Sequence, residues 1–232
     1  MKRPKLTIIV PTYNEHGTVI EMLERVKALP VCKEAIVVDN CSTDGTRELL
    51  VELRDGVRDD ALRIVFQPEN LLKGTSVKTG IALASGEWLV CQDADLEYDP
   101  NDILRLLDYA EKNGAAAVFG SRLSGPDQVR SSGVFHLARV FLSWLFDVLY
   151  RSQITDVATC YKLMRTDVAK SLNLEATGFD LDFEIAAKLR RCGHEIHELP
   201  VSYAPRTHQE GKKLHVGDGF KAVWMLLKCR LR

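Results

Sequence analysis

The sequence predicts an α/β protein in which helices flank a mostly parallel, Rossmann-like central sheet. Short apolar runs rich in β-forming residues alternate with amphipathic stretches such as Val19, Ile20, Leu23 and Val26, which are spaced for one helix face. A strand–helix–strand order of this kind is typical of a parallel sheet covered by helices. The expected strands are residues 6–10, 35–38, 63–66, 88–90 and 115–119.

The second half of the chain has a looser pattern. We expect a Ser/Gly/Pro-containing loop at residues 123–133, then a helix at 134–150, and further on a helix ending near 191 and a strand at 196–203. A polar, basic loop at 205–219 precedes a C-terminal helix. The 232 residues are expected to form a single domain, residues 1–232, whose pattern changes after about residue 120.

Composition excludes several classes of protein. The net charge of -1 gives no bulk attraction to nucleic acid, and the six cysteines contain no CxxC pair that would indicate a disulfide framework. The apolar run at 6–10 is too short for a signal peptide, and no segment reaches the roughly 20 apolar residues of a membrane span. We expect a cytoplasmic protein, compatible with peripheral association with a membrane.

Polar clusters follow each expected strand. In a parallel sheet the carboxyl ends of the strands meet at one edge, where ligands bind. Any one cluster could be a turn or a helix cap, as Ser42 and Asp44 could be for the helix starting at Thr46, but the succession predicts a shared binding site. The clusters are residues 11–15, 39–46, 70–74, 93–97 and 120–122.

The stretch VCQDADLEY (90–98) places Asp93, Asp95 and Glu97 at alternate positions after an apolar run. If the strand continues, the three carboxylates face the same side and could aim at one point. Mutual repulsion would then be relieved by a hard cation such as Mg2+ or Mn2+. A solvated turn is an equally good interpretation of this stretch alone.

The ordered motifs resemble family 2 glycosyltransferases with the GT-A fold. They are PTYNE (11–15), the acidic turn DNCSTDGT (39–46), Lys73-Gly74 before a helix, and DAD (93–95). Within that family the chain is similar to polyprenyl-phosphate sugar synthases of the dolichol-phosphate mannose synthase type. That similarity rests on GSR (120–122), DVATCYKLMR (156–165), Gly178-Phe179, Glu184 and the basic segment 206–212.

The resemblance implies a nucleotide-binding half at residues 1–120 and an acceptor-binding half at 121–232, and it implies site residues within them. Asp93, Asp95 and Glu97 match metal-ligand positions for Mg2+ or Mn2+. The family usually has a second acid at the position of Asn40, and mannose synthases usually have Gln at the position of Glu97, so both departures bear on the choice of base and sugar. The implied nucleotide-binding residues are Pro11, Tyr13, Glu15, Val38, Asp39, Asn40, Lys73, Asp93, Ala94 and Asp95.

Basic residues match the phosphate-binding positions of these enzymes. Arginine forks suit phosphate oxygens and lysine supplies a point charge. The implied catalytic set is Asp93, Asp95, Arg122, Arg206 and Lys212. The acceptor phosphate would be held by Arg122, Arg139, Arg206 and Lys212, with Asp156 and Glu184 as acceptor-side support.

The implied reaction is inverting, metal-dependent transfer of a hexose, with mannose from GDP-mannose favoured, to a polyprenyl or dolichyl phosphate. The alternatives are a UDP-sugar donor (UDP-glucose or UDP-N-acetylglucosamine), a non-lipid glycan acceptor, and a non-catalytic sugar-nucleotide-binding module. In aspartyl phosphohydrolases the DxD motif follows the first strand. In this chain Asp93 follows the fourth expected strand, so that class of enzyme is disfavoured.

Membrane contact is a further expectation. The C-terminal helix carries an apolar stripe beside Lys221, Lys228 and Arg232, a pattern typical of interfacial helices and equally of core-packing ones. The 134–150 helix, with Phe141 and Trp144, is the other candidate to receive a lipid. Partners could include a membrane surface, a membrane protein or a second copy of the chain. The stripe consists of Phe220, Val223, Trp224, Leu227 and Leu231.

Overall fold

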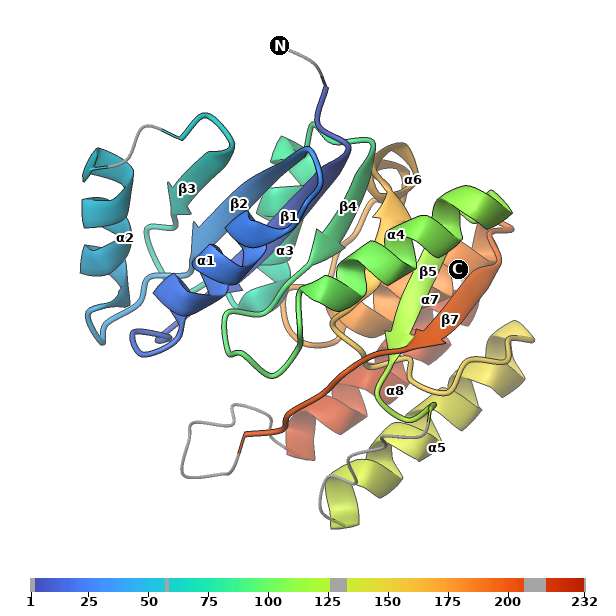
Figure 1. Cartoon of the computed structure of the whole chain (residues 1–232). Coiled ribbons are helices and arrows are strands. Elements are labelled where there is room, and N and C mark those ends of the chain that lie inside the picture. Colours follow the sequence, from blue (N-terminus) through green and yellow to red (C-terminus); the bar gives the residue numbers. More distant parts are fainter. Residues whose placement is uncertain (1–2, 57–58, 126–132, 207–215, 232) are drawn as a thin grey trace.

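The computed structural model describes residues 3–56, 59–125, 133–206 and 216–231, whose strands form a seven-stranded sheet in the order β3-β2-β1-β4-β6-β5-β7 (Figure 1). The predicted parallel α/β architecture is confirmed, with β6 the one strand that runs antiparallel to its neighbours β4 and β5. The strands are β1 (Leu6–Thr12), β2 (Lys33–Asp39), β3 (Leu62–Phe66), β4 (Trp88–Cys91), β5 (Ala117–Ser121), β6 (Lys162–Arg165) and β7 (Ile196–Pro200).

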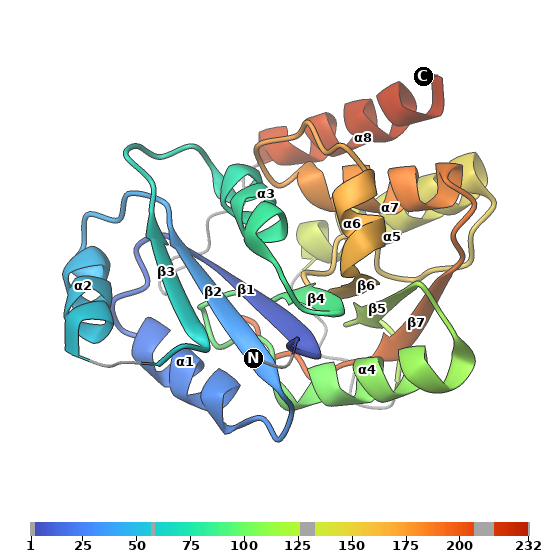
Figure 2. The same ribbon diagram turned by 90° about the horizontal axis from the view of Figure 1, so that it is seen from above.

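Helices cover both faces of the sheet, which explains why consecutive residues of β1, such as Ile8, Ile9 and Val10, are all fully buried. Helices α1 and α4 pack on one face, and α3, α6 and α7 on the other (Figure 2). The helices are α1 (Val19–Ala28), α2 (Thr46–Gly56), α3 (Lys73–Leu83), α4 (Asn101–Asn113), α5 (Gly133–Tyr150), α6 (Thr166–Ser171), α7 (Leu181–Arg191) and α8 (Val216–Leu231).

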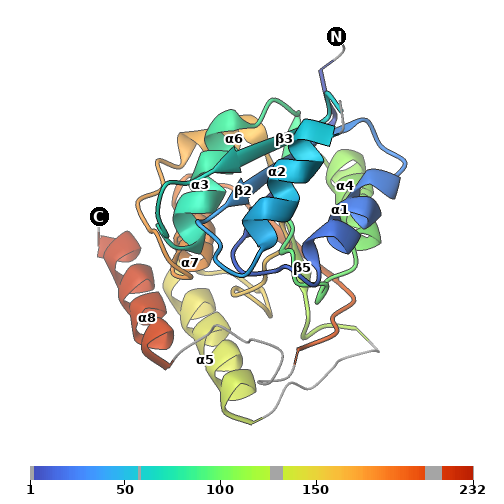
Figure 3. The same cartoon turned by 90° about the vertical axis from the view of Figure 1, so that its left-hand side faces the viewer.

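Helices α5 and α8 lie side by side beyond α7 (Figure 3). The hydroxyl of Tyr150, at the end of α5, donates to the carbonyl oxygen of Leu226 in α8 at 2.7 Å. Helix α8 contacts the rest of the fold through Ala222, Met225, Leu226 and Cys229, which are buried. Within the described chain, no helix combines the length and the apolar character that crossing a membrane requires.

The bounds of three elements differ from the sequence prediction, and one strand was not predicted at all. Strand β5 is Ala117–Ser121 rather than 115–119, β7 ends at Pro200, and residues 216–219 belong to α8 rather than to a loop. Strand β6 was not predicted, because its apolar core is short and is preceded by a charged residue. That residue, Lys162, is buried and its ammonium lies 2.8 Å from the Asp182 carboxylate, so a tertiary ion pair makes the strand possible.

Candidate active site

The carboxyl ends of β1, β2, β4 and β5 lie at one edge of the sheet, and the loops that follow them contact one another. The loops after β1 and β2 are joined through Asn14, whose backbone N–H donates to Ser42 Oγ at 3.0 Å and whose Oδ1 accepts the Thr43 N–H at 2.8 Å. Asn14 has φ of 52°, a left-handed conformation that asparagine tolerates well. Ser42 therefore bridges two loops of the site.

Asp39, the last residue of β2, and Asn40, which follows it, have different surroundings. Asp39 is fully buried; its Oδ1 accepts the Ser42 N–H at 3.2 Å, and Arg47 Nε lies 3.6 Å from its Oδ2. Among the described residues, that Oδ2 has no hydrogen-bond partner. It is a buried acceptor that an N–H group could satisfy.

Asn40 holds the loop before α3. Its Oδ1 accepts the Leu71 N–H at 2.9 Å, and its Nδ2 donates to Asn70 Oδ1 at 2.9 Å. An aspartate could accept the first bond but could not donate the second. This double role gives a physical reason for an amide at position 40. Val38 is fully buried in β2 opposite Pro11, so it packs in the core.

Lys73, the first residue of α3, pairs with Asp93. Its ammonium lies 2.7 Å from the Asp93 carboxylate, and both side chains are about one-fifth exposed. Burial by itself would raise the pKa of Asp93, but the Lys73 charge holds it below its usual value. The start of α3 is placed by Gly74, where a Cβ would lie only 2.6 Å from the Thr177 backbone carbon.

The expectation that Asp93, Asp95 and Glu97 aim at one point is wrong. Strand β4 ends at Cys91, and these acids lie in a turn in which Leu96 has φ of 62°, so strand alternation does not apply. Asp93 faces Lys73. Asp95 and Glu97 instead share one guanidinium with Glu15.

That guanidinium belongs to Arg206, which follows β7. The guanidinium donates to both carboxylate oxygens of Glu15 at 3.0 Å and lies 3.2 Å from Asp95 Oδ2. The backbone N–H of Arg206 donates to Glu97 Oε1 at 2.9 Å. Burial and the charges of Asp93 and Glu97 raise the pKa of Asp95 to about 6. The negative charge here exceeds what one arginine neutralises.

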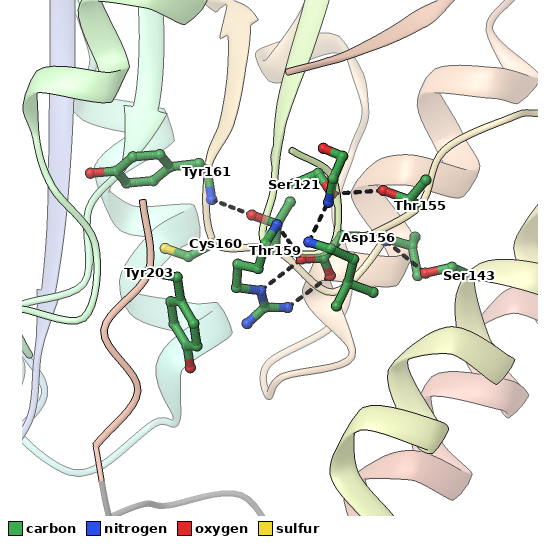
Figure 4. Close-up of polar contacts among 12 residues, drawn as sticks. Ser121, Ser143, Thr155, Asp156, Thr159, Cys160, Tyr161 and Tyr203 are labelled. Carbon is green, nitrogen blue, oxygen red and sulfur yellow. Dashed lines mark hydrogen bonds and ion pairs between the residues drawn. The ribbon is translucent and has the colours of Figure 1, made fainter. Parts of the chain in front are cut away.

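A second buried ion pair lies after β5. Arg122 forms two hydrogen bonds with the fully buried Asp156, from Nε to Oδ2 at 2.7 Å and from Nη2 to Oδ1 at 2.8 Å. Burial opposes the charged form, but the guanidinium keeps the pKa of Asp156 below its usual value. Figure 4 shows how the Asp156 segment is anchored: Thr155 Oγ1 lies 2.6 Å from Ser121 Oγ, and Ser143 Oγ accepts the Val157 N–H at 3.1 Å.

Arg139 extends this basic group from α5. It is partly buried, and its pKa is lowered by burial and then by the positive charge of Arg122. Lys212 lies outside the described residues. Glu184 accepts N–H groups from Glu175 and Ala176 at 3.0 and 2.8 Å and pairs with Lys188 at 2.8 Å, so its contacts hold the turn before α7.

Sequence reasoning missed an aromatic wall. Tyr203, beyond β7, donates its hydroxyl to Glu97 at 2.7 Å and its ring lies 5.2 Å from that of Tyr98. The Arg122 guanidinium carbon is 5.3 Å from the Tyr203 ring centroid, a cation–π distance. The ring of Tyr161 also contacts Tyr98, with the ring centroids 4.6 Å apart and the planes inclined at 31°. Tyr98 ends the acidic stretch and could have been suspected; Tyr203 carried no local signal.

Comparisons with known proteins agree with this geometry. The sequence model of the family described as glycosyl transferase family 2 matches residues 7–172. A low-salt glycan biosynthesis hexosyltransferase, Agl6 of Haloferax volcanii, is 26% identical over 97% of this chain, and a dolichol-phosphate mannosyltransferase of Pyrococcus furiosus is 28% identical over 90%. The chain spans 53% and 59% of the length of these two relatives.

A solved structure has the same fold. Glucosyl-3-phosphoglycerate synthase of Mycobacterium tuberculosis, crystallised with Mn2+, UDP and phosphoglyceric acid, superposes with a TM-score of 0.73 at 18% identity, over 98% of this chain and 78% of that one. The chain belongs to glycosyl transferase family 2 and has the GT-A fold.

Proposed function

We propose that this glycosyltransferase moves a hexose, with inversion of the anomeric carbon, from a nucleotide sugar to a polyprenyl phosphate. The favoured hexose is mannose, with GDP-mannose as the donor. One observation carries the choice of a lipid-phosphate acceptor. Helix α5 contributes Arg139 to the basic group around Arg122 and, on the same helix, exposes Phe141 and Trp144 to solvent by 51% and 57%. Helix α5 thus places a positive charge that suits a phosphate beside exposed apolar side chains that suit a lipid.

Helix α8, which contacts α5, also exposes apolar side chains. Four residues of its predicted stripe are exposed, with Phe220 at 76% and Trp224 at 66%, whereas Val223 packs against the core. Exposed aromatic side chains in this number suit the boundary between lipid headgroups and acyl chains. Lys221, 64% exposed along its side chain, adds attraction to anionic headgroups. We assign this face to a membrane surface.

The acidic group fits a divalent cation. Burial and neighbouring carboxylates raise the pKa of Asp95. The Arg206 guanidinium acts as its counter-ion in the free chain. Asp95 and Glu97 offer the oxygen ligands that Mg2+ and Mn2+ prefer. When bound, the ion would neutralise the diphosphate of the departing nucleotide. The Mn2+ and UDP of the mycobacterial synthase support this assignment.

The chain's own residues position and neutralise the substrates. An acceptor phosphate is already an anion, so no strong base is required. Asp156 is unsuited to be one, because its pKa is lowered and both its oxygens bind Arg122. Asp156 instead fixes the guanidinium that, with Arg139, would hold the acceptor phosphate. Arg206, once displaced from Asp95, would be available to phosphate oxygens.

The residues expected to bind the nucleobase accept guanine and uracil equally. Asp39 Oδ2, which accepts no hydrogen bond from the described residues, suits a ring N–H next to a carbonyl, which guanine and uracil both carry, and access to it requires Arg47 to move. Asn40 supports the neighbouring loop in either case.

The test is a donor and acceptor screen. GDP-mannose, UDP-glucose and UDP-N-acetylglucosamine are each incubated with the chain, Mn2+ or Mg2+, and either a short polyprenyl phosphate or a soluble sugar. We expect mannosyl-lipid as the product and loss of metal-dependent nucleotide binding in Asp95→Asn. A UDP-sugar product would change the donor, transfer only to the soluble sugar would refute the lipid acceptor, and no turnover with any pair would favour a non-catalytic module.

Vesicle binding tests the surface separately. Trp144→Ser and Trp224→Ser remove exposed rings, so folding should be unchanged while binding to anionic vesicles falls. Tyr109→Ser, which alters a ring on the opposite side of the sheet, serves as the control. Equal vesicle binding by all three variants would contradict the assignment of this face.

A further inference from the structure

Beneath the acidic turn lies a cluster with a different chemistry. The Sγ atoms of Cys91 and Cys160 and a carboxylate oxygen of Asp93 all lie within 4.8 Å of one another. Cys91 ends β4, and Cys160 lies in the segment that leads into the neighbouring strand β6 (Figure 4). We propose that these three side chains form a binding site for a thiophilic divalent cation of the Zn2+ class. This inference does not depend on the proposed transfer reaction.

The distances are close to those of a tetrahedral site. Zn–S bonds of about 2.3 Å and Zn–O bonds of about 2.0 to 2.2 Å put neighbouring ligand atoms about 3.3 to 3.8 Å apart. Each pair of ligand atoms therefore needs to approach by about 1.5 Å at most, which side-chain rotation can supply. Cys91 and Cys160 also line a cavity of about 20 Å³. That volume holds one water molecule, which could complete the coordination.

The charges balance. Binding releases the two thiol protons, including the one that Cys160 donates to the Cys91 carbonyl oxygen at 3.5 Å. Two thiolates and the Asp93 carboxylate then oppose the charges of the metal and of Lys73, which leaves the cluster neutral. The Lys73 ammonium is 2.7 Å from either carboxylate oxygen, so it can keep one while the metal takes the other.

The ligand set separates this site from the oxygen-only group at Asp95 and Glu97. Thiolates select soft or borderline cations, whereas carboxylates alone suit Mg2+ and Mn2+. Entry is open, because Cys91 and Asp93 are only partly buried, while Cys160 is 6% exposed. Since Asp93 belongs to the acidic turn, we expect a bound Zn2+ to alter the substrate site next to it.

The test uses Co2+ as a spectroscopic substitute for Zn2+. The background variant replaces the remaining non-buried cysteines, Cys32, Cys41 and Cys192, with serine; all six cysteines are free thiols. Co2+ should produce thiolate-to-metal charge-transfer absorption and the strong visible bands of a tetrahedral ion, both displaced by Zn2+. Cys91→Ser and Cys160→Ser should each weaken the absorption and lower affinity at least tenfold. Zn2+ should also raise the unfolding midpoint of the background variant by about 5 °C at a hundredfold excess over Kd.

Asp95→Asn is the matched control, because it changes the oxygen-only group and leaves both thiols in place. We expect it to keep the charge-transfer bands. Loss of the bands in Asp95→Asn, or bands that persist at full strength in both cysteine variants, would overturn the proposal. Should Cys160→Ser not fold, the partly exposed Cys91→Ser provides the same comparison.

Discussion

Replacing Arg206 with alanine separates the two roles that the structure gives this residue. Its guanidinium neutralises Glu15 and Asp95 in the free chain, with contacts at 3.0 and 3.2 Å, and its side chain is 21% exposed. A charge-assisted hydrogen bond contributes about 1.5 to 3 kcal/mol, and partial exposure reduces that. We expect Arg206→Ala to lower the free energy of unfolding by about 2 kcal/mol, a fall in Tm of roughly 4 to 8 °C.

The same change should strengthen metal binding. In the native chain, a cation that ligates Asp95 must displace the guanidinium, at a cost of about 1 to 2 kcal/mol, which is a five- to thirtyfold change in affinity. Without Arg206 that cost disappears. Mn2+ affinity measured by calorimetry without nucleotide should therefore rise by that factor, while sugar transfer falls at least about a hundredfold because a phosphate-binding charge is lost.

Two controls make this result interpretable. Arg206→Lys retains the charge but not the fork, so it should stabilise the fold more than alanine does and still transfer poorly. Arg105→Ala removes an arginine that is 56% exposed along its side chain and pairs with Asp102 at 2.7 Å, and it should change neither Tm nor Mn2+ affinity appreciably. Unchanged or weaker Mn2+ binding in Arg206→Ala would show that the guanidinium does not compete with a cation.

Three further predictions concern the neighbouring groups. Because the pKa of Asp95 is about 6, protons compete with the metal below that pH, and Mn2+ affinity should fall about tenfold per pH unit between pH 6 and 5; a pH-independent affinity would exclude Asp95 as a ligand. Asp156→Asn leaves the Arg122 charge without its buried partner and should cost about 3 to 5 kcal/mol in denaturant unfolding at neutral pH. Since Arg122 lowers the pKa of Asp156, that stability is lost in the native chain as the pH falls through the folded-state pKa, so wild type and variant should converge in acid. Gly74→Ala places a Cβ against the Thr177 backbone and should destabilise by about 1 to 3 kcal/mol, whereas Gly17→Ala, which has no heavy atom within 4 Å, should not.

Most of the succession of strands and helices along the chain, and the edge of the sheet at which the loops meet, could be predicted from local patterns. Apolar runs and helical spacing are properties of neighbouring residues, and parallel strands place their carboxyl ends together whatever follows them. That placement brings the loops after β1 and β2 together, as the hydrogen bond between Asn14 and Ser42 shows, but it does not by itself name the partner of any side chain. Strand β6 did not follow, because burial of Lys162 depends on Asp182, a partner twenty residues away.

The partners of the charged residues depended on tertiary structure. Local sequence indicated that carboxylates and arginines would surround one edge, which is what a binding site for phosphates and a cation requires. It contained no information on whether Arg206 would face Glu15, 191 residues away in the chain, or solvent. Nor did it separate Asp93, held by Lys73, from Asp95, held by Arg206. Coulomb forces and desolvation act on distance and burial in space, and only the folded chain sets both for these side chains.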